Sequence, residues 1–374
     1  MNARHGFIVG KFYPPHRGHH DLINTASEVC DDVTVVVAAS DVESIPVELR
    51  TAWIEEEHAH QCNVHVVSCI DNYPIDYGDA AVWDLHMKVF LRSLSTSPVT
   101  TPVDAVFSNE PYGKELARRL SATAVDTGLV GAERRSASMI RADPIRYWDE
   151  LSPSERAWFT KRIVVVGAES TGTTTVALAL RDHFRRRGGH FGLTQWVPEF
   201  GRDLTWQKLA RLHAERAIAG APRPSMDDIT WTDEDFVQVC HIQNEREETA
   251  ARLSGPVIIC DTDSWATGIW QERYMGHRTP EATALSGHPN KALYLLTHHV
   301  GVPFVQDGVR DGEVLREAMT DQFAQELTAS NLPHVVLDDR SLDARVSRAV
   351  AAIDATLASG WPLGVPLEYR ASRT

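Results

Sequence analysis

The sequence predicts an α/β protein with two doubly wound parallel sheets, one in each half of the chain. In both halves, short apolar runs typical of buried strands alternate with segments of helical periodicity, as parallel sheets with crossover helices require. In both halves an apolar run, at residues 7–9 and 162–166, also leads into a glycine-containing turn and then a helix. We expect one domain over residues 1–150 and a second over residues 151–374.

Strands in the first half are expected at residues 33–38, 64–67 and 104–107 as well, with helices between them. A polar segment at residues 148–155 reads as a linker with a short helix. In the second half we expect strands within residues 256–263, 292–296 and 334–337, and a closing helix at residues 342–357.

Residues 10–19 read Gly-Lys-Phe-Tyr-Pro-Pro-His-Arg-Gly-His and follow the first strand directly. A strand that ends in such a turn before a helix can hold phosphate at the helix N-terminus. His16 and His19 would lie on one face of the first helical turn and donate to the same phosphate, with Lys11 as a third donor. The alternative is an ordinary turn with two surface histidines.

These residues resemble the G-x-F-x-P-x-H-x-G-H signature of the nucleotidyltransferase superfamily, which moves AMP or CMP from a nucleoside triphosphate to a phosphate-bearing acceptor. The resemblance implies that His16, His19 and Lys11 stabilise charge on the transferring phosphates without a covalent intermediate. It also implies ATP as substrate and Mg²⁺ on its phosphate oxygens. Further ATP contacts are expected at Gly10, Phe12 and Gly18.

A second segment, Ser-Ala-Ser-Met-Ile-Arg at residues 136–141, resembles the Ser-x-Thr-x-x-Arg element of the same family. Ser138 replaces the threonine and keeps its hydroxyl. The resemblance places Ser136 and Ser138 at the helix cap and the ATP phosphates, and Arg141 on the β- and γ-phosphates. Taken alone, such a segment would indicate only a helix cap.

The acceptor and adenine contacts rest on the same resemblance. Nicotinamide mononucleotide adenylyltransferases of this type contact the acceptor at the positions of Arg50, Trp53 and Trp83, and an aromatic face suits a cationic pyridinium ring. Core packing is the alternative for Trp83, and the favoured one for Trp53. Ser108 follows its strand at the carboxyl edge, where the family binds adenine.

Residues 167–174, Gly-Ala-Glu-Ser-Thr-Gly-Thr-Thr, have the spacing of a phosphate-binding P-loop. Their glycines let backbone N–H groups surround a phosphate, and Thr174 stands where a Mg²⁺-binding hydroxyl is expected. Thr173 replaces the usual lysine. The expected ATP contacts of this loop are Gly167, Ser170, Thr171, Gly172, Thr173, Thr174 and Thr175.

Further along the chain, the strand within residues 256–263 ends in carboxylates. Asp261 is expected to hold Mg²⁺, and Asp261 or Asp263 to receive the proton of an acceptor hydroxyl. Residues 305–312 indicate a glycine-hinged lid that would place Arg310 over the transferring phosphoryl group.

With Glu-Phe-Gly-Arg-Asp at residues 199–203 added, the whole chain resembles the NadR-type bifunctional proteins, a nicotinamide mononucleotide adenylyltransferase fused to a ribosylnicotinamide kinase. The resemblance implies ATP, nicotinamide mononucleotide and nicotinamide riboside as small-molecule substrates. It places Glu199, Arg202, Asp203 and Asp307 at the substrate. The chain departs from the family pattern at Thr173 and in a proline-containing stretch at residues 219–232.

Composition agrees with a cytoplasmic enzyme of two ordinary cores, since 43% of the 374 residues are hydrophobic and 24% charged. The net charge of −14 argues against a nucleic-acid partner. No apolar run approaches the ~20 residues of a membrane span, and no signal peptide is evident. The five cysteines have no metal-binding spacing and read as reduced thiols.

Three functions remain open on the sequence. The first is a bifunctional enzyme of NAD synthesis and salvage, and the second is an adenylyltransferase whose P-loop half is a weakly catalytic regulatory module. The third, a DNA-binding regulator, is disfavoured because no recognition helix precedes the first motif and the charge is acidic. The choice between nicotinamide and nicotinic acid, the role of residues 219–232 and the presence of a homo-oligomer also stay open.

Overall fold

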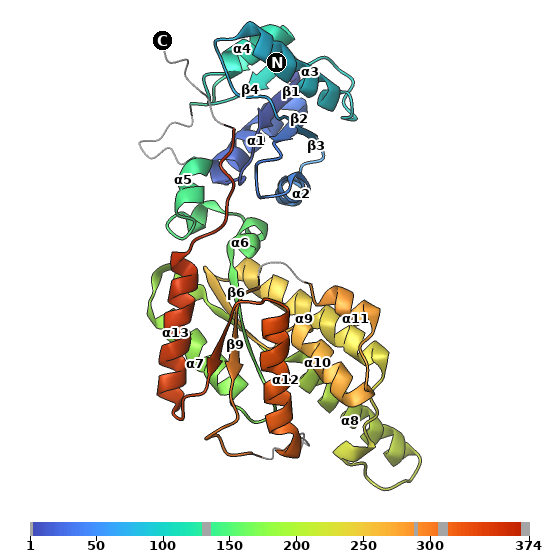
Figure 1. The fold of residues 1–374 in the computed structure, drawn as a ribbon. Helices are drawn as coiled ribbons and strands as arrows, with labels where there is room; N and C mark the ends of the chain where they lie inside the picture. Colours follow the sequence, from blue (N-terminus) through green and yellow to red (C-terminus); the bar gives the residue numbers. More distant parts are fainter. Residues whose placement is uncertain (1–2, 129–135, 288–290, 306–312, 368–374) are drawn as a thin grey trace. The chain divides into compact units, whose positions relative to one another are not determined.

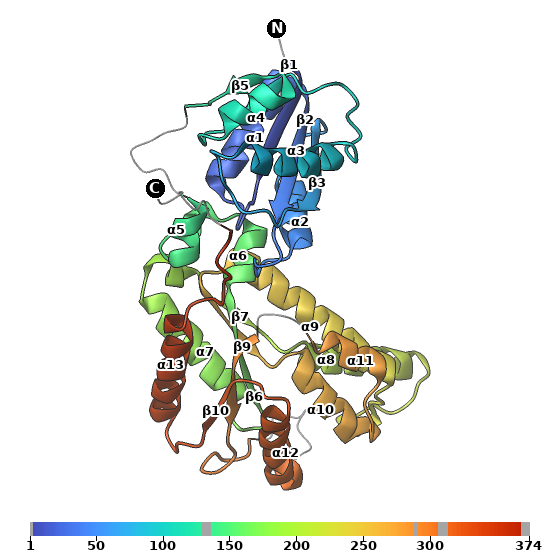
Figure 2. The same ribbon diagram turned by 45° about the horizontal axis from the view of Figure 1, so that its top comes forward.

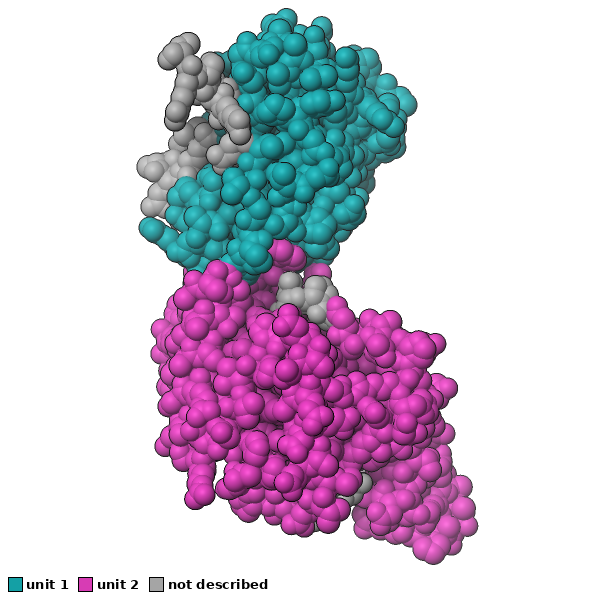
Figure 3. Space-filling view, viewed as in Figure 1, with its two compact units in different colours: residues 1–155, 361–374 teal, residues 156–360 magenta. Residues whose placement is uncertain are grey.

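The computed structural model describes residues 3–128, 136–287, 291–305 and 313–367. It contains two five-stranded parallel sheets with flanking helices, which confirms the predicted fold class (Figure 1). The contacts divide the chain into an N-terminal unit, residues 1–155 with the segment that follows residue 360, and a C-terminal unit, residues 156–360 (Figure 3). That this last segment groups with the first sheet is not indicated by the sequence. The expected boundary at residue 150 stays a prediction.

The N-terminal sheet has the strand order β3-β2-β1-β4-β5. Its strands are β1 (Ala3–Gly10), β2 (Cys30–Ala39), β3 (Val64–Ile70), β4 (Ala105–Phe107) and β5 (Thr123–Val125). The helices of this unit are α1 (Arg17–Val29), α2 (Val47–Glu57), α3 (Ala80–Leu94), α4 (Gly113–Leu120), α5 (Ala137–Ala142) and the first residues of α6 (Pro153–Phe159), which follows the 3₁₀ turn η1 (Trp148–Glu150).

Successive side chains of β1 point to opposite faces of this sheet, and each face has its own core. Ile8 packs with Ile23 of α1 and Ile54 of α2 on one face. On the other face, Phe7 packs with Phe90 of α3 and Leu116 of α4. Strand order reverses beside β1, so the turn after Gly10 opens at the switch point where such sheets bind ligands.

The C-terminal sheet has the order β10-β9-β6-β8-β7. Its strands are β6 (Lys161–Gly167), β7 (Gln195–Val197), β8 (Val257–Asp261), β9 (Lys291–Thr297) and β10 (His334–Leu337). Its helices are α7 (Thr173–Arg186), α8 (Phe200–Ile218), α9 (Asp233–Leu253), α10 (Ser264–Met275), α11 (Pro280–Leu285), α12 (Arg316–Ala329) and α13 (Leu342–Ala358), with 3₁₀ turns η2 (Gly189–Leu193), η3 (Met226–Asp228) and η4 (Glu313–Leu315).

Helices cover both faces of this sheet too. α7 and α13 pack on one face through residues such as Leu180 and Ile353. α9, α10 and α12 pack on the other, where Ile269 and Phe323 meet the alternate residues of β6 and β8 (Figure 2). The central strand β6 delivers the P-loop to the carboxyl edge. None of the helices in the described part of the chain has the length and apolar character needed to cross a membrane.

Candidate functional site

The N-terminal unit has a pocket of about 270 Å³ beside the turn that follows β1. Residues 10–13 line it, and His16 caps α1, with its Nδ1 accepting a hydrogen bond from the Gly18 N–H at 3.1 Å. A nitrogen that accepts carries no proton, so the proton of the neutral His16 ring is on Nε2. Nε2 is therefore free of the cap and able to donate to an anion.

His19 stands next to His16, with ring centroids 3.9 Å apart, and it lines the pocket. Its Nδ1 is buried and makes no hydrogen bond within the described residues. Burial, reinforced by the neighbouring His20, lowers the pKa of His16 to about 4. Burial, reinforced by the His16 and His20 charges, lowers the pKa of His19 well below its ordinary value. Both rings are therefore neutral hydrogen-bond donors near pH 7.

A buried carboxylate, Glu43, positions the lysine of the motif. Its Oε1 accepts from Lys11 Nζ at 2.9 Å and its Oε2 from Arg50 Nη1 at 2.6 Å. Burial acts to raise the pKa of Glu43, but these two hydrogen bonds outweigh it and hold the pKa below its usual range. Arg50 is 1% exposed and donates also to the Lys11 and Ile45 carbonyls. Arg50, expected at the acceptor, is thus engaged by the protein itself.

The second signature begins α5. Ser136 caps this helix by accepting from the Met139 N–H, and its Oγ lies 2.7 Å from that of Ser138. Arg141 lines the pocket, donates to the Tyr13 carbonyl oxygen and lies 4.9 Å from the Tyr13 ring centroid. The helix therefore places Arg141 in the lining of the same cavity as His19.

Aromatic rings and carboxylates form a second part of the lining of the N-terminal pocket, called here its aromatic wall. Trp83 is 5% exposed and lines the pocket, and its indole N–H donates to the Tyr77 carbonyl at 3.3 Å. Tyr77 stacks on Tyr112 with centroids 5.9 Å apart. The other residues of this wall that sequence reasoning did not single out are Asp71, Tyr73, Asp76, His86, Phe90 and Glu110. Seven of the residues expected at this site are not among the described residues that line the pocket: His16, Gly18, Arg50, Trp53, Ser108, Ser136 and Ser138.

The C-terminal unit has a pocket of about 730 Å³ built on the P-loop. Gly172 adopts φ +90° before α7, a conformation that favours glycine. At Gly167, an added Cβ would lie 2.3 Å from Thr297 Oγ1, so the close approach of β9 requires glycine. The P-loop residues that line the pocket are Gly167, Ala168, Glu169, Ser170, Gly172, Thr173, Thr174 and Thr175. Thr171 is buried and donates to the Ala168 carbonyl at 2.7 Å, a structural role.

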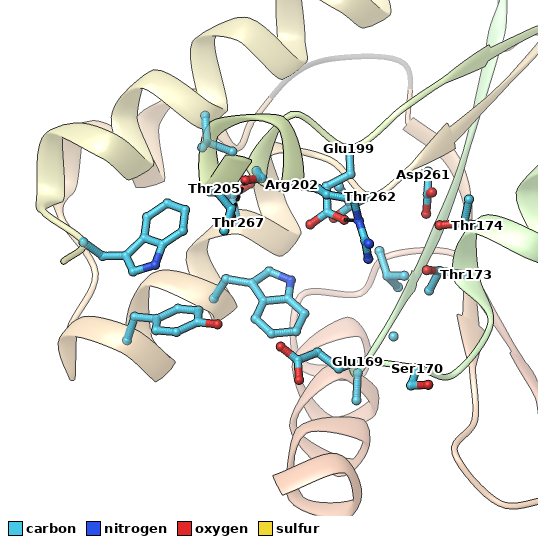
Figure 4. Close-up of a pocket in the computed structure, with 18 of the residues that line it drawn as sticks. Glu169, Ser170, Thr173, Thr174, Glu199, Arg202, Thr205, Asp261, Thr262 and Thr267 are labelled. Carbon is cyan, nitrogen blue, oxygen red and sulfur yellow. Dashed lines mark hydrogen bonds and ion pairs between the residues drawn. The ribbon is translucent and has the colours of Figure 1, made fainter. Parts of the chain in front are cut away.

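Of the two candidate carboxylates, Asp261 faces this pocket and Asp263 does not. Asp261 ends β8 beside the hydroxyls of Thr173 and Thr174 (Figure 4). Burial raises the pKa of Asp261, and hydrogen bonds from Thr174 and Thr173 oppose the rise. Asp263 is 0% exposed, caps α10 through the Ala266 N–H, and accepts from Tyr294 Oη at 2.7 Å.

Glu199 precedes the first residue of α8 and lines the pocket, and its Oε2 lies 3.9 Å from Arg202 Nε. Burial, reinforced by the charge of Asp261, raises the pKa of Glu199 to about 7. Asp203, also expected at the substrate, instead accepts from Arg246 Nη2 at 2.8 Å and is not among the described lining residues. Arg310 and Asp307 lie outside the described residues.

The far end of this pocket is aromatic. Trp231 stacks on Tyr274 with centroids 5.8 Å apart, and its ring is tilted against that of Phe236 at 5.3 Å. Trp270 adds a further ring to the lining. Trp231 comes from residues 219–232, whose other lining members are Ser225, Met226, Asp227 and Ile229. Residues 219–232, to which the sequence assigned no role, therefore contribute part of the pocket lining.

Metal binding depends on few residues. The described part of the chain holds no group of three or more His, Cys, Asp or Glu side chains arranged around a metal position. Asp261 and the Thr174 hydroxyl are suited to Mg²⁺ that arrives with a nucleotide, because Mg²⁺ is commonly bound by one or two protein oxygens plus phosphates.

Fold and pockets together define an α/β protein of two units, each with a pocket beside a strand-to-helix turn. Residues 162–345 match the AAA domain family. The chain is 23% identical to the "Trifunctional NAD biosynthesis/regulator protein NadR" of Escherichia coli (strain K12), over 93% of this chain and 82% of that protein. The solved "NadR protein in complex with NAD and AMP-PNP" has the same fold, with a TM-score of 0.68, 19% identity and coverage of 99% of both chains. The solved "NadR protein in complex with NR" matches with a TM-score of 0.67 and 20% sequence identity, and the match covers 96% of this chain and 97% of that one. The resemblance to NadR-type proteins is therefore confirmed.

Proposed function

We propose that the chain is a bifunctional enzyme: its N-terminal unit transfers AMP from ATP to nicotinamide mononucleotide, and its C-terminal unit phosphorylates nicotinamide riboside. The observation that carries the proposal is that each unit combines a phosphate-binding turn with an aromatic wall in one pocket. A pyridine nucleotide has both a phosphate or ribose end and a flat cationic ring. The names of the relatives, NAD biosynthesis and NadR with NAD, AMP-PNP or NR, support the same substrates.

In the N-terminal unit, an oxygen of the acceptor phosphate attacks the α-phosphorus of ATP, and pyrophosphate leaves. His16 Nε2 and His19, both neutral, donate hydrogen bonds to oxygens on which charge develops. Lys11 and Arg141 supply the positive charge that the histidines lack. Mg²⁺ bound with ATP would neutralise further phosphate charge.

The acceptor ring has a natural place against Trp83 and the Tyr77 and Tyr112 stack. An aromatic face attracts a pyridinium cation, and the Asp71, Asp76 and Glu110 carboxylates of the wall add to that attraction. The same carboxylates repel an acidic substituent. We therefore propose the nicotinamide form over the nicotinic acid form as acceptor.

In the C-terminal unit, the backbone around Gly172 receives the nucleotide phosphates, and Thr174 with Asp261 is the pair that would hold Mg²⁺. The riboside ring is proposed to lie by Trp231 and Tyr274, and its hydroxyls near Glu199. Asp261, beside Thr173 and Thr174 at the phosphate end, is the candidate to accept the hydroxyl proton.

One observation favours a second function for this unit. Thr173 has no ammonium group, so the P-loop lacks a contact to the transferred phosphoryl group, and a nucleotide-binding regulatory module would look the same. Single-turnover transfer of phosphate from ATP to nicotinamide riboside by the full chain decides between them. Phosphorylated riboside supports the kinase, whereas ATP binding without transfer supports the module.

A further inference from the structure

The segment that follows α13 closes onto the N-terminal unit at Gly364. The Gly364 N–H donates to Ser44 Oγ at 2.6 Å, and the Gly364 carbonyl accepts from Tyr13 Oη at 3.1 Å. Tyr13 Oη in turn accepts from the Ser44 N–H at 3.0 Å. These three hydrogen bonds form a closed ring among segments that lie far apart in the sequence, and each member is held from two sides.

The contact is close enough to require glycine. A Cβ added at Gly364 would lie 2.0 Å from the Val42 carbonyl oxygen and 3.2 Å from Ser44 Oγ. The oxygen belongs to the backbone and cannot move aside as the end of a side chain can. Any other residue at this position would therefore push the segment away from residues 42–44.

Tyr13 connects this contact to the pocket. It is 1% exposed, and the guanidinium groups of Arg50 and Arg141 lie 4.7 and 4.9 Å from its ring centroid. Arg141 also donates to the Tyr13 backbone carbonyl. Glu43, which holds Lys11, lies between the two residues that Gly364 contacts. Both pocket cations therefore depend on residues that Gly364 holds in place.

We propose that residues 361–367 are a positioning element of the adenylyltransferase site, with Gly364 holding Tyr13 and residues 42–44 so that Arg141 and Lys11 face the triphosphate. The proposal rests on the proposed function of this unit. It has a consequence for the chain as a whole: residues 1–360 contain every motif residue of the transferase, yet they lack part of its site.

The test compares Gly364→Ala with Val365→Ala in the full chain. Val365 is the neighbouring residue and is 77% exposed, so its truncation controls for a change in the segment that spares the contact. For Gly364→Ala we expect KM for ATP in dinucleotide synthesis to rise by roughly tenfold or more, the loss of one or more charge-assisted phosphate contacts. Phosphorylation of nicotinamide riboside should not change.

Tyr13→Phe provides a second arm, because it removes the hydroxyl that both donates to Gly364 and accepts from Ser44. Residues that act through one contact have non-additive effects. The double variant Gly364→Ala/Tyr13→Phe should therefore be no more impaired than the worse single variant. Full additivity of the two effects would contradict a shared role.

Amide hydrogen exchange gives a readout that does not need turnover. Gly364→Ala should speed exchange in residues 42–44 and weaken the protection that ATP with Mg²⁺ confers on residues 10–19, while Val365→Ala does neither. If exchange at 42–44 rises but ATP protection and KM stay at wild-type values, the segment is packing only and the proposal is overturned. Unchanged exchange at 42–44 overturns it as well. If the wild-type chain forms no dinucleotide, the proposed function fails, and the ATP protection at 10–19 still decides the positioning role.

Discussion

Glu43 offers the sharpest structural prediction, because this one buried carboxylate balances two cations, Lys11 and Arg50. Its side chain is 0% exposed, and that of Arg50 is 1% exposed. Glu43→Gln keeps the shape of the side chain but leaves the Arg50 guanidinium buried without a counter-charge. Breaking a buried ion pair by removal of one partner costs roughly 3–5 kcal/mol. We therefore expect the free energy of opening of the N-terminal unit to fall by that amount.

Hydrogen exchange of the full chain measures this effect unit by unit. An opening free energy lower by roughly 3–5 kcal/mol quickens exchange about 150- to 5,000-fold in amides that exchange through opening of the whole unit. Peptides from β1 and β2 should show it. Peptides from β6 and β8 belong to the other unit and serve as the internal reference.

Glu48→Gln is the matched control, since it is the same chemical change at an exposed position of α2. Exchange in β1 and β2 should stay close to wild type in this variant, because exposed charges contribute little to stability. The reasoning would be refuted if Glu43→Gln quickened exchange there by less than about threefold, as a surface substitution does.

Three further predictions concern the C-terminal pocket. Because burial and the Asp261 charge raise the pKa of Glu199 to about 7, the ionised fraction of this carboxyl group increases around that pH. We therefore expect kcat/KM for nicotinamide riboside to rise with pH through this range in wild type and to lose that step in Glu199→Gln. Trp231→Ala should raise KM for the riboside by roughly tenfold or more and leave KM for ATP unchanged, since a desolvated cation–π contact contributes about 2 kcal/mol. Thr173→Lys should raise single-turnover phosphorylation by roughly 10- to 150-fold, the effect of a charge-assisted phosphate contact of about 1.5–3 kcal/mol. The first prediction is contradicted if wild type and Glu199→Gln have the same pH profile. The second is contradicted if Trp231→Ala shifts KM equally for the riboside and for ATP, and the third if Thr173→Lys does not raise the rate of phosphorylation.

The fold and its two strand-to-helix turns could be predicted because their signals are contiguous. Apolar runs, glycines and the helix that follows lie within about a dozen residues at both turns, after residues 7–9 and 162–166. The short edge strands β5 and β7 were missed because Thr-Ala-Val and Gln-Trp-Val are not continuous apolar runs, unlike the equally short Ala-Val-Phe of β4. The individual site residues stay predictions.

Trp83 was expected at the acceptor, but the other rings of the aromatic walls could not be predicted, because they come from segments that only the fold brings together. Trp231 lies just before α9 and Tyr274 lies in the last turn of α10, and their rings stack in the folded chain. The choice between Asp261 and Asp263 was hidden for a different reason. Thr262 adopts φ +68°, which ends the strand's alternation and turns Asp263 into a helix cap. A positive φ at threonine has no sequence signature.

The most direct test of the central claim is dinucleotide formation by the purified full chain. Given ATP, Mg²⁺ and nicotinamide mononucleotide, wild type should release pyrophosphate and dinucleotide in equal amounts. His19→Ala should lower that rate by roughly two to three orders of magnitude, since a preorganised donor to transition-state charge contributes about 2.7–4 kcal/mol, while riboside phosphorylation continues. No dinucleotide from wild type, or a His19→Ala rate within about threefold of it, would contradict the account.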